Sequence, residues 1–124
     1  MIKGAVWSAD ETRILSWTSG SSVYVLDALT KRDPLLTLRH EGTVVGAKWN
    51  KDETRILSWS ADSSVRVWDG ATGEPLNTMV HEAGVNGAAW NKDETRILSW
   101  SIDGTIRMWD AASAANIITM SHAP

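Results

Sequence analysis

The segment WNKDETRILSWS, residues Trp49–Ser60, returns without a change as residues Trp90–Ser101, and its central part appears once more as Asp10–Trp17. Trp49, the first residue of the first full copy, stands 42 residues after Trp7, and Trp90, the first residue of the second, stands 41 residues after Trp49. If the count runs from Trp90 to Pro124 and continues at Met1, it reaches Trp7 after another 41 residues. The 124 residues are therefore expected to hold three whole periods. A fixed period of about 40 to 45 residues is typical of repeat proteins, whose units bury their apolar faces against one another.

Composition disfavours several kinds of site. The chain has 15 acidic and 12 basic residues and a formal net charge of −3, and no basic run is present that could follow a line of phosphates. We therefore expect no nucleic-acid binding. Cysteine is absent, which excludes a disulfide framework and thiolate metal ligation. The three His are spaced 41 residues apart and have no second imidazole nearby, so we expect no metal site and no cofactor.

The sequence shows no membrane or export signal. No apolar stretch approaches the roughly 20 residues that a membrane-spanning helix needs. The first seven residues, MIKGAVW, lack the apolar core of a signal peptide. We expect a soluble, untargeted, cytoplasmic protein that does not bind membranes.

The aromatic residues are unusual, because the chain has eight Trp, one Tyr and no Phe. The Trp residues recur at equal phase in the repeats, with Leu26 in one of the expected places. Large rings dominate the buried area of small domains, so recurrence of this kind predicts core packing for the whole set. The classes are Trp7, Trp49 and Trp90; Trp17, Trp59 and Trp100; and Trp68 and Trp109.

The second repeat reads as four short strands joined by polar turns. Its strands are predicted from β-branched residues, from alternation of apolar and polar residues, and from the turn residues between them. No window has helical periodicity, and the connections are too short for crossover helices. The prediction is therefore an all-β fold of four-stranded antiparallel meanders. The strands expected in this repeat are Thr43–Trp49, Arg55–Ser60, Val65–Trp68 and Leu76–Val80, and Asn116–Ser121 is the last strand expected in the third.

Several of these residues resemble the signature of the WD-repeat β-propellers. Val65–Asp69 and Ile106–Asp110 resemble the ending that names that family, Ser101–Thr105 resembles its inner turn, and His40 and His81 stand where the family has a His before the first strand. The usual Gly before that His is replaced by Arg39, Val80 and Ser121. The resemblance implies a single repeat domain, residues 1–124, divided into blades at about 1–39, 40–80 and 81–124.

His40, Ser58 and Asp62 supply the residue types of a serine hydrolase. His81, Ser99 and Asp103 repeat them at the same spacing. A hydrolase has no reason to duplicate its triad, and no Gly-x-Ser-x-Gly motif is present, so we expect no catalytic residue. The family resemblance implies instead a buried structural network in which the His links the Ser, the Asp and a Trp of the third strand, here Trp68 and Trp109.

The first repeat departs from this pattern. It keeps Ser16, but Gly20 stands in the Asp position and Leu26 in the Trp position. The His that would serve it is His122, which is 18 positions from Ser16 when counted through the chain ends. The two residues would meet in space if the C-terminus of one chain adjoined the N-terminus of another.

Three blades are too few for a closed ring, because closed propellers usually have four to eight. An open arc would expose one apolar blade face at each end, and the two faces are complementary because each copies an internal contact. We therefore expect head-to-tail association that closes a ring. A homodimer with six blades is favoured, a homotrimer with nine is second, and a piece cut from a longer ring is a third reading. The expected subunit junction contains Ile2, Trp7, Ser16, Ile118, Met120 and His122.

Function is not named by any motif. The interpretation we favour is that the chain is a self-assembling propeller fragment, natural or engineered, without catalytic activity. The alternative, implied by the family resemblance, is a scaffold that binds a protein or peptide on the face that carries the His loops. The candidate partner-binding residues on that face are Glu41, Ala61, Glu82 and Ile102.

Overall fold

The computed structural model describes residues 2–29 and 34–121, and within these ranges it contains strands and no helix. Each strand is short and ends at a polar turn, as the alternation of apolar and polar residues predicts. The first repeat forms β1 (Ile2–Trp7), β2 (Arg13–Thr18), β3 (Ser22–Asp27) and β4 (Leu36–Arg39). The second forms β5 (Val44–Trp49), β6 (Arg55–Ser60), β7 (Ser64–Asp69) and β8 (Pro75–Val80). The third forms β9 (Val85–Trp90), β10 (Arg96–Ser101), β11 (Thr105–Asp110) and β12 (Asn116–Ser121).

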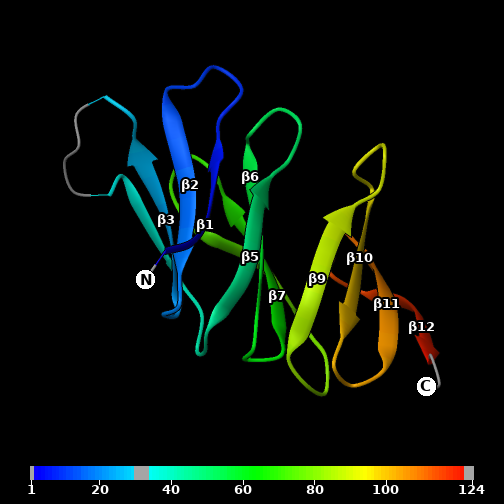
Figure 1. The fold of residues 1–124 in the computed structure, drawn as a ribbon. Coiled ribbons are helices and arrows are strands. Elements are labelled where there is room, and N and C mark those ends of the chain that lie inside the picture. Colours follow the sequence, from blue (N-terminus) through cyan, green and yellow to red (C-terminus); the bar gives the residue numbers. More distant parts are fainter. Residues whose placement is uncertain (1, 30–33, 122–124) are drawn as a thin grey trace.

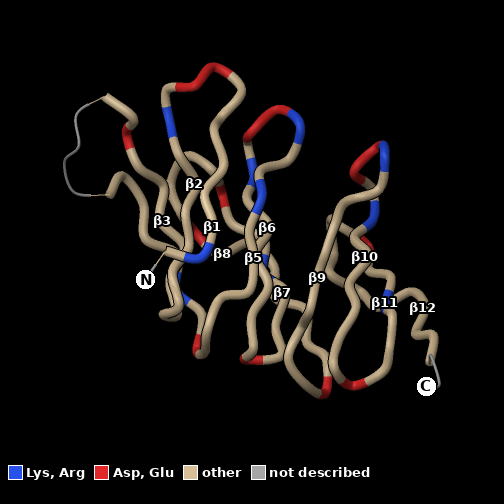
Figure 2. The backbone as a smooth tube through the Cα atoms, in the orientation of Figure 1, with Lys and Arg blue, Asp and Glu red and all other residues tan. Residues whose placement is uncertain are grey.

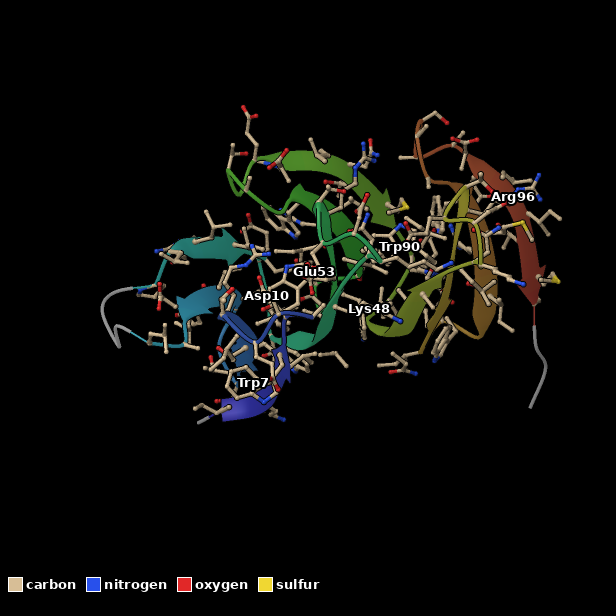
Figure 3. The ribbon with its side chains drawn as sticks, turned by 90° about the horizontal axis from the view of Figure 1, so that it is seen from above. Trp7, Asp10, Lys48, Glu53, Trp90 and Arg96 are labelled. Atoms are coloured by element: carbon tan, nitrogen blue, oxygen red, sulfur yellow. The ribbon has the colours of Figure 1, made fainter. Side chains whose placement is uncertain are left out.

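Each repeat folds into its own sheet of four antiparallel strands, and each sheet keeps the order of the sequence. The prediction of an all-β chain with three four-stranded antiparallel blades is confirmed. The sheets stand side by side (Figure 1) and fan outward from β1, β5 and β9, as the view from above shows (Figure 3). The chain on its own forms an arc, and closure of a ring stays a prediction.

Close contact between a Gly and a Trp shapes the inner part of every sheet. Gly46 on β5 pairs with Trp59 on β6, and a Cβ atom added to Gly46 would lie 2.4 Å from the Trp59 ring. The same contact joins Gly4 to Trp17 and Gly87 to Trp100. Because glycine has no side chain, the indole can lie directly against the inner strand.

Two apolar cores fill the spaces between neighbouring sheets. We call the side of a sheet that is directed toward the preceding repeat its leading face, and the opposite side its trailing face. In the first core the trailing face of the first sheet packs against the leading face of the second, and the second core joins the second and third sheets in the same way. The first core contains Leu15, Val23, Val25 and Leu38, packed against Val44, Ala47, Trp49, Ile56 and Trp68. The second contains Leu57, Val65, Val67 and Met79, packed against Val85, Ala88, Ile97, Trp109 and Ala111.

The prediction that all eight Trp pack in the core is wrong for two of them in the single chain. Trp49, Trp68 and Trp109 are buried, whereas Trp7 is 56% exposed and Trp100 is 41% exposed. Trp7 lies on the first sheet's leading face and Trp100 on the third sheet's trailing face, where the described residues supply no neighbouring sheet. The missing neighbour is the physical reason for the difference.

Candidate functional site

His40 occupies the centre of a polar network inside the second sheet. It follows β4 directly, and its Nε2 atom lies 2.6 Å from the Ser58 hydroxyl on β6. Its Nδ1 atom lies 3.1 Å from an Asp62 carboxylate oxygen. Trp68 on β7 donates its indole N–H to Ser58 over 2.8 Å, and its ring meets the imidazole edge-on. The four residues that the sequence singled out are therefore in contact with one another.

The hydrogen bonds of the network assign its protons. Because Ser58 accepts from the Trp68 indole, its hydroxyl hydrogen is free to donate to Nε2 of His40. Nδ1 then carries the imidazole proton and donates to Asp62. In this arrangement His40 is neutral and Asp62 is ionised. Burial lowers the pKa of His40 below its ordinary value of 6.5, although the Asp62 carboxylate opposes that shift.

Asp62 is held as a carboxylate by several donors. Burial alone would raise its pKa, but hydrogen bonds from the Ser64 hydroxyl and from the backbone N–H groups of Glu41 and Ser64 outweigh it and lower the pKa. The Arg66 guanidinium adds an ion pair at 3.7 Å. Ser64 and Arg66 were not predicted as members of the network. Their signal was a hydroxyl two residues after the Asp and an Arg four residues after it, a spacing that recurs in the third repeat.

The third sheet repeats this arrangement. His81 lies 2.6 Å from Ser99 and 3.2 Å from Asp103. Trp109 donates to Ser99 over 2.9 Å, and Thr105 takes the place of Ser64. Burial lowers the pKa of His81, as it does for His40.

Burial decides what chemistry these groups can perform. Ser58 and Ser99 are both 0% exposed, and each hydroxyl is already bonded to a His and to a Trp. A serine nucleophile must reach a substrate and needs oxyanion donors beside it. The geometry instead satisfies buried polar groups inside the sheet.

The first sheet carries an incomplete version of the network. Ser16 and Ser22, the counterparts of Ser58 and Ser64, are both 7% exposed. Neither hydroxyl contacts a His within residues 2–29 and 34–121. Gly20 and Leu26 replace the Asp and the Trp. His122, which the sequence assigned to this sheet from another chain, lies outside the described residues.

The leading face of the first sheet is an exposed copy of a buried surface. Ile2 is 70% exposed, whereas Val44, its counterpart in the second sheet, is fully buried. Trp7 is 56% exposed, whereas its counterpart Trp49 is 8% exposed. A hollow of about 190 Å³ is lined by Ala5, Val6, Trp7 and Ile14 on this face.

The trailing face of the third sheet is exposed in the same way. Leu98 is 38% exposed and Met120 is 45% exposed, whereas Leu57 and Met79 at the corresponding positions are buried. Ile118, which the sequence also assigned to the junction, is 43% exposed. Leu98 and Met108 line a hollow of about 280 Å³ near Trp90.

The residues of the predicted partner-binding face are all exposed. Glu41 and Ala61 lie in the loops before β5 and β7, and Glu82 and Ile102 lie in the corresponding loops of the third repeat. Ile102 is 71% exposed. Figure 2 shows acidic residues in this set of loops, whereas the loops at the opposite end of the sheets carry both acidic and basic residues.

In the part of the chain that the structure describes, no helix has the length and apolarity to cross a bilayer. The comparison with curated proteins found no significant match. The family model described as WD domain, G-beta repeat matches residues 32–69 and 73–110, which together are more than half of the chain. Repeats of this kind are typical of propeller-type scaffolds that mediate protein interactions. The signature at the ends of β7 and β11, the four-stranded sheets and this match agree, and the chain belongs to the WD40 family.

Proposed function

We propose that this chain is a ring-forming WD-repeat subunit that binds a second copy of itself head to tail. The trailing face of the third sheet in one copy packs against the leading face of the first sheet in the next. The observation that carries the proposal is the contrast between Trp7 and Trp49, which occupy the same place in successive repeats but differ in exposure from 56% to 8%. The exposed end faces hold the residue types that are buried inside the chain.

Complementarity supports a head-to-tail contact over a contact between two identical faces. Inside the chain, a trailing face with Leu57 and Met79 packs only against a leading face with Val85 and Ile97. The third sheet offers Leu98 and Met120 in the trailing positions, and the first sheet offers Ile2 and Ile14 in the leading positions. A junction built from these faces repeats an arrangement that the sequence already forms twice.

The incomplete polar network of the first sheet supports the same arrangement. His40 and His81 directly follow β4 and β8, and His122 directly follows β12. In a ring, the His122 residue of one copy would meet Ser16 and Ser22 of the next, as His40 meets Ser58 and Ser64. These buried hydroxyls would then have the imidazole partner that the first sheet lacks in cis.

We propose a homodimer with six blades as the assembly, and a homotrimer with nine blades as the second choice. Six blades lie within the range of four to eight that closed propellers usually adopt, and nine lie outside it. A heterologous contact closes when its rotation divides a full turn. The dimer and the trimer would use the same two faces, but they differ in the rotation between neighbouring chains.

Two single substitutions on opposite faces test the head-to-tail contact. Leu98→Asp places a charge on the trailing face of the third sheet, and Trp7→Asp places one on the leading face of the first. Each variant alone is expected to sediment as a monomer. An equimolar mixture is expected to form an open heterodimer, because each variant keeps the face that the other lacks. Circular dichroism of each variant checks that its sheets are folded.

Association between two copies of one face would give a different pattern. Leu98→Asp would then still dimerise through its intact leading face, and the mixture would form no new species. Either result would overturn the head-to-tail proposal.

A second candidate function is a scaffold that binds a protein or peptide on the His-loop face. The exposure of Ile102, at 71%, favours it, because an apolar side chain in a loop tip can anchor a partner. Recovery of a specific partner by the unmodified chain, and its loss in Ile102→Asp, would support this function. Recovery of rings alone would leave self-assembly as the function.

A further inference from the structure

A directional hydrogen bond joins the loops of neighbouring sheets at both internal junctions. Glu53, in the loop between β5 and β6, accepts a hydrogen bond of 2.7 Å from the backbone N–H of Ala9 in the first repeat. Glu94, in the corresponding loop of the third repeat, accepts one of 2.8 Å from the backbone N–H of Lys51. In both cases a carboxylate reaches backward to the same loop of the preceding sheet. We call this contact the loop latch. Figure 3 shows Glu53 beside Asp10 of that loop in the first repeat.

The Glu residues of these loops share one unusual backbone conformation. Glu11, Glu53 and Glu94 occupy equivalent positions and have φ values of 60°, 61° and 61°. Residues other than glycine adopt positive φ infrequently, and the conformation has an energetic cost. All three loops share an Asp that accepts a hydrogen bond from the Thr two residues later. The first repeat therefore holds Glu11 in the conformation in which Glu53 and Glu94 make their latches.

Glu11 and Lys92 are the two halves of a latch that the chain does not close. Glu11 is exposed, and the described residues contain no sheet before the first one to offer it a backbone N–H. Lys92 is the counterpart of Ala9 and Lys51, and the described residues contain no sheet after the third one to offer its N–H a carboxylate.

An Arg strengthens one of the internal latches. Arg13 lies 3.6 Å from the Glu53 carboxylate, and its guanidinium lies over the Trp49 ring at 5.3 Å from the centroid. Arg96 is the counterpart of Arg13 in the third repeat, and Trp7 is the counterpart of Trp49 in the first. The same three groups are thus available at the two open ends. The third repeat offers the Arg, and the first repeat offers the indole of Trp7 and the carboxylate of Glu11.

We propose that Glu11 of one copy accepts a hydrogen bond from the backbone N–H of Lys92 in the preceding copy, whose third sheet packs against its first, and that this latch determines how the end faces align. The inference rests on the head-to-tail assembly proposed above. Apolar contact is non-directional and allows two faces to slide, whereas a carboxylate bonded to a fixed backbone N–H sets one relative height. Arg96 of the same neighbouring copy adds an ion pair to Glu11 and stacks on Trp7.

Removal of the Glu11 carboxylate tests the latch. The substitution Glu11→Ala is expected to raise the dissociation constant of the assembly by about tenfold to one hundredfold, because every junction in the ring loses a charge-assisted hydrogen bond. Glu11→Gln keeps an acceptor without the charge, so its effect is expected to be smaller. Glu74→Gln is the matched control, since Glu74 is an exposed residue in the loop between β7 and β8 of the second sheet, which is the middle sheet, and loss of its charge should leave the dissociation constant unchanged.

Hydrogen exchange at the Lys92 amide gives a second readout. Within the assembly of the unmodified chain this amide is expected to be protected, and in Glu11→Ala it should exchange as in the monomer, with the melting temperature of the monomer unchanged. If the unmodified chain assembles and Glu11→Ala assembles equally well, the latch is overturned while head-to-tail assembly stands. If the unmodified chain does not assemble, both are overturned.

Discussion

Identical residue types behave differently at the internal junctions and at the two ends of the chain. Trp49 is 8% exposed and Trp7 is 56% exposed, and Leu57 is 0% exposed while Leu98 is 38% exposed. Each pair occupies the same place in its repeat, so the local sequence cannot explain the difference. The presence of a neighbouring sheet does. The two end faces carry the residue types that are buried at the internal junctions, and their apolar residues differ in this way from the isolated apolar residues of an ordinary surface.

The largest expected effect comes from the same truncation made at both locations. Leu57→Ala removes a buried side chain between the second and third sheets, and we expect the free energy of unfolding to fall by about 2 to 5 kcal/mol. Leu98→Ala makes the same change on the open trailing face and is expected to cost the monomer less than about 1 kcal/mol. Urea unfolding of both variants, at concentrations where the chain is monomeric, checks the difference. Equal losses at the two positions would contradict the account.

The two versions of the polar network offer a second matched pair. Ser58→Ala leaves the His40 ring and the Trp68 indole N–H without their common partner, and should reduce the free energy of unfolding by about 1 to 3 kcal/mol. Ser16→Ala removes a hydroxyl that contacts no His in the described chain and should have little effect on the monomer. Thermal melting of both variants measures this. A Ser58→Ala variant as stable as the unmodified chain would show that the network does not stabilise the sheet.

The Gly–Trp contacts sharpen the comparison between the middle and the end of the arc. Gly46→Ala places a methyl group against Trp59, whose ring is confined between two sheets, and we expect a loss of about 1 to 3 kcal/mol. Gly87→Ala meets Trp100, which is 41% exposed and can turn toward solvent, so its cost should be smaller. Differential scanning calorimetry of the two variants gives the ranking. A greater loss for Gly87→Ala would contradict it.

The dependence of stability on pH should report the networks of the second and third sheets. The pKa values of His40 and His81 are lowered in the folded chain, so the unfolded chain binds more protons as the pH falls below 6.5. The stability that the neutral His residues contribute is therefore complete above 6.5 and is lost as the pH falls through their folded pKa values. The pKa of Asp62 is also lowered, so a further loss is expected as the pH falls below 3.8.

Melting temperatures across this range, compared with those of His81→Gln, check the assignment. The variant should show a weaker dependence below 6.5, because one of the buried imidazoles is gone. An unchanged dependence would assign the loss to other groups.

Much of the fold could be predicted because turn residues and a fixed spacing show where each repeat and each strand begins and ends. The turn residues between Trp49 and Arg55 place two strands side by side, and the fixed spacing of His40, Ser58, Asp62 and Trp68 brings them together once four antiparallel strands form. The resemblance to a known family supplied the pairing of these four residues, which spacing alone would have left open.

Two features were out of reach of the sequence. The loop latch depends on the positive φ of Glu53 and Glu94, and local residue preferences do not favour that conformation for Glu. The exposure of Trp100 depends on a neighbouring sheet that the described residues do not contain, whereas that of Trp7 follows from the open end face that the sequence predicted. A residue pattern indicates which side chains are apolar, whereas their burial depends on what the folded chain places beside them.

The mass of the particle that the unmodified chain forms in solution tests the central claim most directly. One chain has a mass of 13.6 kDa, and light scattering on a column-separated sample resolves integral multiples of it. We expect a particle of twice that mass, or three times that mass for the nine-bladed ring, that persists on dilution. A monodisperse particle of 13.6 kDa at every concentration would contradict the claim that the two ends of the chain complete one another.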